Sequence, residues 1–373
     1  MNNSRENDLQ DFLTFHNWND AAIKNIDGDA SFRSYKRLER ETEIKSLDTS
    51  LQIDTSNDDN KKIKPFVAST IEPAILMDAP PPQEDVRPFI KTANFLIKNG
   101  LKAPVIYADN IDKGFLLLED FGDIRISKMV ENTDVSNIDS LEAEKKIYKT
   151  AIDVLVYIHK TCKAKNYFTE YSNEKLITEV ELLKDWYIPN MCNNGVSAKE
   201  QDRFMEIWSN LLDKISIGKE NYVLVLRDYH ADNLMWLNTG SKTSIDKIGL
   251  LDFQDAVFGH PAYDLMSLLE DVRRNVLNSN EDWSICNELI DYYLSEINYL
   301  DSKKFIDDYS ILAAQRNCKI LGIFARLCIR DNKHSYKKFF PRVLKCLEHD
   351  LEHEHLMELK DWFSNNIFNN TKF

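Results

Sequence analysis

Three polar residues near two apolar runs have the types and spacing to carry out chemistry. Val223–Asn233 reads V-L-V-L-R-D-Y-H-A-D-N, so Asp228 closes an apolar run and Asn233 follows five positions later. Leu251–Gln254 reads L-D-F-Q, which places Asp252 after a second apolar run. A carboxylate can accept a proton from an attacking hydroxyl, and Asn and Asp offer the oxygen ligands that Mg²⁺ prefers. This order predicts phosphoryl transfer, with Asp228 as the catalytic base and Asn233 and Asp252 as metal ligands.

The same residues also have a purely structural interpretation. Asp228 and Asp252 could be turn residues and Asn233 a helix cap, because these residue types favour such positions. A single D-x-x-x-x-N match is weak evidence, but the joint occurrence on two apolar runs favours the catalytic interpretation.

Composition limits the classes of protein that this chain can belong to. Its 373 residues favour two lobes, and a 43% hydrophobic share is enough for a core. The net charge of −14, from 47 basic and 61 acidic residues, argues against nucleic-acid and anionic-membrane partners. Nucleotide binding stays possible because it needs only local cations and Mg²⁺.

Two further features predict a cytoplasmic protein. The segment M-N-N-S-R-E-N-D at the start is polar and lacks the apolar region of a secretory signal, and no stretch approaches the roughly 18 apolar residues of a membrane span. The six cysteines include no C-x-x-C pair, which is typical of reduced, buried thiols. They are Cys162, Cys192, Cys286, Cys318, Cys328 and Cys346.

The elements that must position these residues fall into two blocks. Ile71–Leu118 reads as strand, helix, strand and strand, with the helix over Val86–Asn99. After Gly122 the periodicity is mostly helical, with helices predicted over Ile138–Lys160, Glu174–Tyr187 and Ser197–Ile215, and a short helix is also expected over Asp8–Trp18. We therefore expect an α+β chain with a small β-rich lobe over residues 1–121 and a mainly helical lobe over 122–373. Glu43–Ser69 is polar with few core anchors, so we expect a flexible insert; a lid is the alternative.

Several motifs carry a resemblance to a known family. R-D-Y-H-A-D-N, D-F-Q-D-A and G-H-P-A-Y-D-L resemble the aminoglycoside phosphotransferase-like branch of the kinase fold. Four further segments narrow the resemblance to one group within that branch: G-D-A-S-F-R-S-Y, L-M-D-A-P, G-F-L-L-L-E-D-F-G and L-G-I-F-A-R-L-C-I-R-D. Together they resemble the bacterial anomeric kinases of N-acetylmuramate and N-acetylglucosamine, which return recycled cell-wall sugars to precursor synthesis.

The resemblance implies a protein-kinase-like bilobal fold, with residues 1–121 as the nucleotide-binding lobe, and it implies ATP and Mg²⁺ as cofactors. It also assigns roles by position. Asp228 would be the base toward the C1 hydroxyl of the sugar. Leu118–Phe121 would be the hinge that meets adenine, so Glu119 and Phe121 are nucleotide-binding candidates. The loop over the phosphates would comprise Gly28, Asp29, Ala30, Ser31, Phe32 and Arg33.

The chain also departs from the wider family. The third strand, I-L-M-D-A-P, has no lysine to pair with the nucleotide phosphates, and Arg33, Lys36 or Arg37 could supply that charge. The residue two before the base is Leu226, where His is usual.

Candidates for contact with the acceptor are fewer. Asp255 could reach the acceptor or the metal, with a turn role as the alternative. Arg326 and Arg330 lie four apart on one helical face and could meet a substrate carboxylate, although ion pairing with acids such as Asp331 is the simpler expectation. Asp264 reads as a structural residue that anchors the catalytic loop or caps the next helix.

Taken together, these patterns predict an ATP-dependent kinase that phosphorylates the anomeric C1 hydroxyl of N-acetylmuramate and/or N-acetylglucosamine. Its partners would be the sugar and ATP, without nucleic acid or membrane, and it would be a monomer or weak homodimer. The alternatives are an aminoglycoside O-phosphotransferase and a non-catalytic nucleotide-binding relative.

Overall fold

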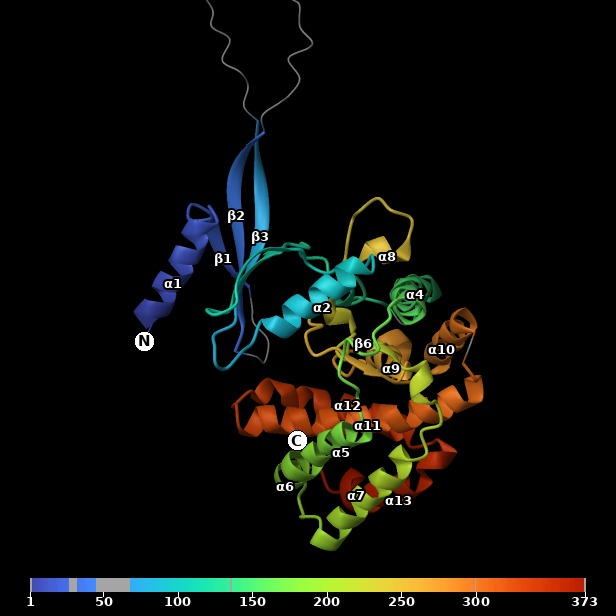
Figure 1. Ribbon diagram of the computed structural model, residues 1–373. Helices are drawn as coiled ribbons and strands as arrows, with labels where there is room; N and C mark the ends of the chain where they lie inside the picture. The colour runs from blue at the N-terminus through green and yellow to red at the C-terminus, as the bar shows by residue number, and fades with distance from the viewer. Residues whose placement is uncertain (1, 27–31, 45–67, 135, 299, 372–373) are drawn as a thin grey trace, which may run out of the picture. The chain divides into compact units, whose positions relative to one another are not determined.

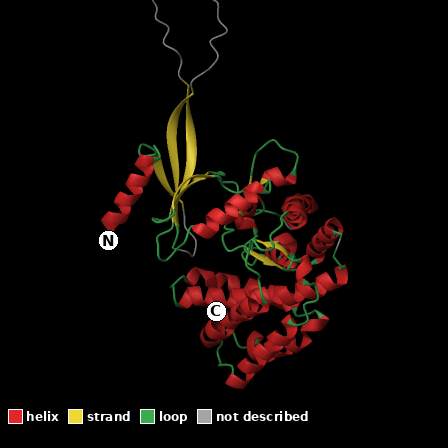
Figure 2. Ribbon diagram, in the orientation of Figure 1, coloured by secondary structure: helices red, strands yellow, loops and turns green. Residues whose placement is uncertain are grey.

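The computed structural model describes residues 2–26, 32–44, 68–134, 136–298 and 300–371. The chain forms two compact units (Figures 1 and 2). Met1–Ile90 and Pro104–Asp120 make up the first unit, and Lys91–Ala103 and Phe121–Phe373 make up the second. The first contains an antiparallel sheet and the second is mainly helical, so the predicted fold class is confirmed.

The first unit is built on a five-stranded antiparallel sheet. The strand order is β1-β2-β3-β5-β4, and the long central hairpin of β2 and β3 pairs Ser34 with Asp78 at one end and Ile44 with Ala68 at the other. The strands therefore continue into both ends of the predicted insert, whose residues 45–67 lie outside the described part. The bounds are β1 (Ala22–Ile26), β2 (Ser34–Ile44), β3 (Ala68–Asp78), β4 (Ile106–Asn110) and β5 (Phe115–Glu119).

Helix α1 (Asn2–Phe15) covers one face of this sheet, as Figure 1 shows. Because side chains alternate along a strand, Leu38 and its neighbours Ala74 and Leu76 share one face, and these three are buried in a cluster with Phe12 of α1. The Phe12 ring stacks on the Phe115 ring at 5.6 Å. An ion pair between Arg5 and Asp78 also joins α1 to β3.

The opposite face of the sheet includes Ile75 and Met77 of β3, the strand that lacks the phosphate-pairing lysine of the wider family. Tyr35 lies opposite Met77, and Arg37 lies opposite Ile75. Their parity places them on the face away from Leu38 and α1. Helix α2 (Arg87–Lys98) matches the helix expected over Val86–Asn99.

The second unit is organised around α11 (Ser302–Ile329), whose middle is buried on most sides. It contacts α5 (Asn173–Leu182), α9 (Ala262–Leu269) and α12 (Phe340–Asp350), the last running beside it in Figure 1. The remaining longer helices are α4 (Ile138–Thr161), α7 (Ala198–Leu212), α10 (Ser284–Ile297) and α13 (Met357–Phe363).

One of these helices departs slightly from the prediction, and another begins where it was predicted. The helix predicted over Glu174–Tyr187 is α5 followed by one π-helical turn, Leu183–Tyr187. The helix predicted to start after Ser197 does so, and the Ser197 hydroxyl accepts from the Glu200 N–H at 3.3 Å as its N-cap.

Two short ladders frame the candidate catalytic residues. β6 (Val223–Val225) pairs with β9 (Val257–Gly259), and β7 (Leu234–Trp236) pairs with β8 (Ile248–Leu250). The strands are only three residues long, so Asp228 and Asp252 lie in the turns beyond them rather than at their last positions. Within the described ranges, no helix is long and apolar enough to cross a membrane.

Candidate active site

A buried aspartate, Asp264, forms hydrogen bonds with the backbone of the loop that carries Asp228. Asp264, in α9, is fully buried and accepts backbone N–H hydrogen bonds from Leu226 at 2.6 Å and Arg227 at 2.8 Å. Burial raises the pKa of Asp264 to about 7, against the lowering effect of these two hydrogen bonds. The prediction that Asp264 anchors the catalytic loop is confirmed.

The residue before the predicted base adopts an unusual backbone conformation. Arg227 has φ of 72°, in the left-handed region that non-glycine residues rarely adopt. Its amide is fixed by Asp264, and its guanidinium pairs with Glu179 of α5 at 2.5 Å. Contacts on both sides of the turn thus stabilise a strained position next to half-buried Asp228.

The two predicted metal ligands meet in the structure. The Asn233 side-chain nitrogen donates to the Asp228 carbonyl at 3.0 Å and lies 3.4 Å from Asp252 Oδ2. The second oxygen of Asp252 accepts from Gln254 Nε2 at 2.8 Å. These contacts use the amide nitrogen of Asn233 and leave its oxygen available to a cation. An amide oxygen and a carboxylate side by side fit Mg²⁺, a hard ion that prefers oxygen ligands.

His230 braces the same loop. It is buried and lies 3.3 Å from Asn233 Nδ2 and 3.1 Å from Arg273 NH1. Burial, with Arg273 as the largest neighbouring charge, lowers the pKa of His230 well below its usual value, so the ring is neutral at pH 7 and can accept a hydrogen bond. Arg273 also approaches Asp232 at 3.8 Å. No local sequence pattern distinguishes Arg273 from the other arginines, so its contact with His230 could not be predicted from the sequence.

The predicted hinge residues have well-defined surroundings, each within its own unit. In the second unit, the Phe121 ring lies on Gly249 so closely that a Cβ there would be 2.6 Å from the ring, which explains the need for glycine. In the first unit, the Glu119 backbone N–H donates to the Val105 carbonyl at 2.8 Å. Asp120 forms a two-point ion pair with Arg37, at 2.6 and 3.1 Å.

Arg33 is more enclosed than Arg37, another cation considered as a replacement for the missing lysine, with side chains 14% and 20% exposed. Its guanidinium pairs with Glu84 at 2.9 Å, and both side chains are less than 15% exposed, at 14% and 12%. Glu84 also accepts from the Phe32 backbone N–H at 3.1 Å. The preceding loop candidates, Gly28, Asp29, Ala30 and Ser31, lie outside the described residues.

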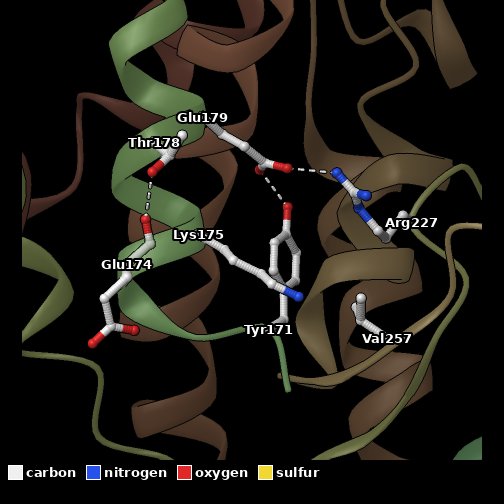
Figure 3. Close-up of a pocket in the computed structure, with 7 residues that line it drawn as sticks. All are labelled: Tyr171, Glu174, Lys175, Thr178, Glu179, Arg227 and Val257. Carbon is white, nitrogen blue, oxygen red and sulfur yellow. Dashed lines mark hydrogen bonds and ion pairs between the residues drawn. The ribbon is translucent and has the colours of Figure 1, made fainter. Parts of the chain in front are cut away.

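A cavity of about 350 Å³ opens beside Arg227 in the second unit (Figure 3). Glu179 on its wall pairs with Arg227 and with Lys319 of α11, the latter at 3.2 Å. It also accepts a hydrogen bond from the Tyr171 hydroxyl. The contacts of Glu179 with Arg227, Lys319 and Tyr171 could not be predicted from the sequence, because these residues are far apart in the chain or share no local pattern. The lining residues are Tyr171, Glu174, Lys175, Thr178, Glu179, Arg227 and Val257.

The remaining acceptor candidates show no common arrangement with the catalytic loop. Asp255 is exposed in the turn after D-F-Q. Arg330 pairs with Asp331 at 2.7 Å, the simpler expectation for it. Burial, together with the charge of Arg330, lowers the pKa of half-buried Arg326. A role for Asp255, Arg326 or Arg330 in substrate binding stays a prediction.

The fold and this cluster define a phosphotransferase, and comparison with known proteins agrees. Residues 57–286 match the model of the phosphotransferase enzyme family, to which the chain therefore belongs. A relative from Caulobacter vibrioides named N-acetylmuramate/N-acetylglucosamine kinase is 33% identical, with 97% of each chain covered. A relative of the same name from Pseudomonas aeruginosa is 30% identical, over 74% of this chain and 76% of its own.

Solved structures show the same fold at low sequence identity. A choline/ethanolamine kinase family protein from Mesorhizobium loti superposes with a TM-score of 0.56 at 10% identity, covering 97% of this chain and 98% of its own. A spectinomycin phosphotransferase, solved with ADP and spectinomycin, gives a TM-score of 0.54 at 13% identity, covering 91% and 97%. Identities this low support the fold and nothing finer.

Proposed function

We propose that this protein is an ATP-dependent kinase that phosphorylates the anomeric C1 hydroxyl of N-acetylmuramate and/or N-acetylglucosamine, in the recycling of cell-wall sugars. The observation that carries phosphoryl transfer is the contact between Asn233 and Asp252 beside the Asp228 loop. The choice of acceptor is supported by four relatives at 28–33% identity that carry the name N-acetylmuramate/N-acetylglucosamine kinase.

Each residue of the cluster has a defined role in this proposal. Asp228 accepts the proton of the C1 hydroxyl as that oxygen bonds to the γ-phosphorus of ATP, while the bond from this phosphorus to the bridging oxygen breaks and ADP leaves. An anomeric hydroxyl is more acidic than an ordinary alcohol, so an aspartate is a sufficient base. Asn233 and Asp252 hold Mg²⁺, and His230 and Asp264 keep the loop in position. When bound, Mg²⁺ neutralises charge on the transferring phosphoryl group.

Arg33 is our choice for the cation that replaces the third-strand lysine. Its pairing with Glu84, just before α2, resembles the lysine–glutamate ion pair that orients the nucleotide-binding lysine in protein kinases. Arg37 is engaged by Asp120 instead. A guanidinium held by a carboxylate can still donate its remaining N–H groups to phosphate oxygens.

The experiment that tests the proposal measures ADP release with N-acetylmuramate, N-acetylglucosamine, kanamycin or no acceptor. We expect turnover with at least one acetylated sugar and none above background with kanamycin. Turnover with kanamycin alone would establish an antibiotic kinase, and ATP binding without turnover would establish a non-catalytic relative. A reducing-end assay identifies the position, because phosphorylation at C1 removes the reducing end and phosphorylation elsewhere leaves it.

A further inference from the structure

We infer that the cavity beside Arg227 binds the carboxylate of an acidic acceptor sugar, and that Lys175 is the side chain that contacts it. The inference rests on the proposed function and deepens it. N-acetylmuramate is N-acetylglucosamine with an O-lactyl group, so the two sugars differ by one carboxylate that Lys175 would recognise.

The position of the cavity fits an acceptor site. Arg227 lines it and is bonded directly to Asp228, the proposed base. Val257 lies on the same wall and is the first residue of β9, which pairs with β6 at the start of the catalytic loop. An acceptor held here is therefore bordered by the segment that carries the base.

The cavity lining holds two acids, Glu174 and Glu179, and two cations, Lys175 and Arg227, and these charges are unevenly engaged. Burial opposes ionisation of Glu179, but the charges of Lys319 and Arg227 outweigh it and hold the pKa of Glu179 below its usual value. One carboxylate therefore faces two cations at neutral pH, at 2.5 and 3.2 Å. Glu179 is therefore engaged by Arg227 and by Lys319, which lies outside the lining, and Lys175 is the lining cation that an anionic ligand would meet.

Lys175 is a cation of the lining that is not committed elsewhere. It comes from the first turn of α5, is exposed, and has no hydrogen bond or ion pair to another described residue. In Figure 3 its ammonium extends across the cavity on the side of Tyr171 and Val257. The neighbouring acid, Glu174, directs its carboxylate away from Arg227 in the same view. Lys175 is thus free to pair with a ligand.

The rest of the wall is rigid and suited to a sugar with methyl groups. The Tyr171 hydroxyl is tied to Glu179 and lies 3.1 Å from the Tyr263 hydroxyl, while the Arg227 guanidinium sits 5.2 Å from the Tyr171 ring centroid. Val257 offers an apolar surface to a lactyl or acetyl methyl. A polycationic aminoglycoside would meet like charge at Lys175, whereas the carboxylate of an acidic sugar would meet opposite charge there.

The test compares the two sugars in the full-length protein. Lys175→Gln should raise the KM for N-acetylmuramate about tenfold, the loss expected for one charge-assisted hydrogen bond, with kcat little changed. The KM for N-acetylglucosamine should not change, because that sugar has no carboxylate. Lys175→Glu should have a larger effect on N-acetylmuramate alone, and Lys175→Arg should restore most of the affinity.

The matched control is Lys199→Gln, which removes the same charge from exposed Lys199 in α7. It should leave both sugars unaffected. Salt gives a second readout, since kcat/KM for N-acetylmuramate should fall more steeply with ionic strength than kcat/KM for N-acetylglucosamine, and Lys175→Gln should remove most of that difference.

Each contrary outcome points to a different failure. An equal change for both sugars in Lys175→Gln, or no change for N-acetylmuramate, would overturn the assignment of Lys175. Wild-type turnover with N-acetylglucosamine but not N-acetylmuramate would overturn the carboxylate site while leaving the proposed kinase intact. Turnover with neither sugar would overturn the proposed function and this inference with it.

Discussion

At the scale of single residues, the structure around Asp228 distinguishes it from the other aspartates of the chain. It follows a residue with φ of 72° and precedes a buried tyrosine whose hydroxyl donates to the Ala151 carbonyl at 2.8 Å. The loop is thus fixed on both sides of the aspartate by backbone and side-chain hydrogen bonds. Positioning of this kind supplies much of the rate in phosphoryl transfer.

Replacing Asp228 by Asn should lower kcat by about 10²-fold or more, because the amide cannot accept the hydroxyl proton. Steady-state ADP release measures the loss, and nucleotide binding should be retained. The control is Asp213→Asn, which changes the same charge at an exposed position after α7. Near-normal activity in Asp228→Asn would remove it from the role of base.

Arg33 allows a second test at this scale. Arg33→Gln should weaken ATP binding by about tenfold, because a guanidinium donates charge-assisted hydrogen bonds to phosphate that an amide cannot match. Calorimetry with an ATP analogue measures this independently of turnover.

The control for Arg33 is Arg40→Gln. Arg40 also lies in the first unit and pairs with a glutamate, Glu72, at 2.7 Å, but its strand parity puts it on the face covered by α1. Unchanged ATP affinity in Arg33→Gln would direct attention to Arg37, because Lys36 shares the strand parity of Leu38 and Arg40.

At the scale of elements, α1 stabilises the sheet that would carry the nucleotide. Its apolar residues close the face of the sheet that carries Leu38 and Phe115. The helix was expected over Asp8–Trp18 from the spacing of its apolar residues. It starts earlier, at Asn2, and ends at Phe15, because contacts such as the Arg5–Asp78 ion pair extend it beyond the apolar stretch.

Phe12→Ala should destabilise the first unit by about 3–5 kcal/mol, the usual cost of removing a buried phenylalanine ring. Phe12 is 5% exposed and stacks on Phe115. Hydrogen exchange of the Leu116–Leu118 amides should accelerate. Phe15→Ala, three residues on and 82% exposed, should leave their exchange unchanged; equal effects would mean that α1 does not pack as described.

At the scale of the whole molecule, burial of ionisable groups couples stability to pH. His159 in α4 is fully enclosed, with Nδ1 2.7 Å from the Tyr293 hydroxyl and Nε2 buried without a hydrogen-bond partner among the described residues. Burial, and to a lesser degree the charge of His260, lowers the pKa of His159 to about 3. The folded protein thus keeps His159 neutral where the unfolded chain protonates it.

The sign of the pH effect follows from that difference. Below the unfolded pKa of about 6.5, protonation favours the unfolded chain, so this contribution to stability is lost as the pH falls toward 3. Between pH 7.5 and 5 the wild type should lose about 2 kcal/mol of unfolding free energy relative to His159→Gln.

Urea denaturation at the two pH values measures this loss. His334→Gln, at an exposed position, should show the same pH dependence as the wild type. If His159→Gln also behaved like the wild type, His159 would have to titrate normally in the folded protein.

Much of the fold could be read from local patterns. Apolar periodicity located α2, α4 and α7 to within one or two residues at their starts, because burial of one helical face imposes that period. The types and order of Asp228, Asn233 and Asp252 predicted the chemistry, because phosphoryl transfer requires a base and oxygen ligands in a short loop.

Other features depended on contacts between distant segments. The strained turn at Arg227 requires Asp264, 37 residues away, and the π-helical turn after α5 packs on α11. The ion pairs beside the cavity join Glu179 of α5 to Arg227 in the turn after β6 and to Lys319 of α11. Local sequence encodes residue type and periodicity, and these alone determined the class of reaction. Which charges face one another across a cavity was decided only by the tertiary structure, because packing brings together residues that share no local pattern.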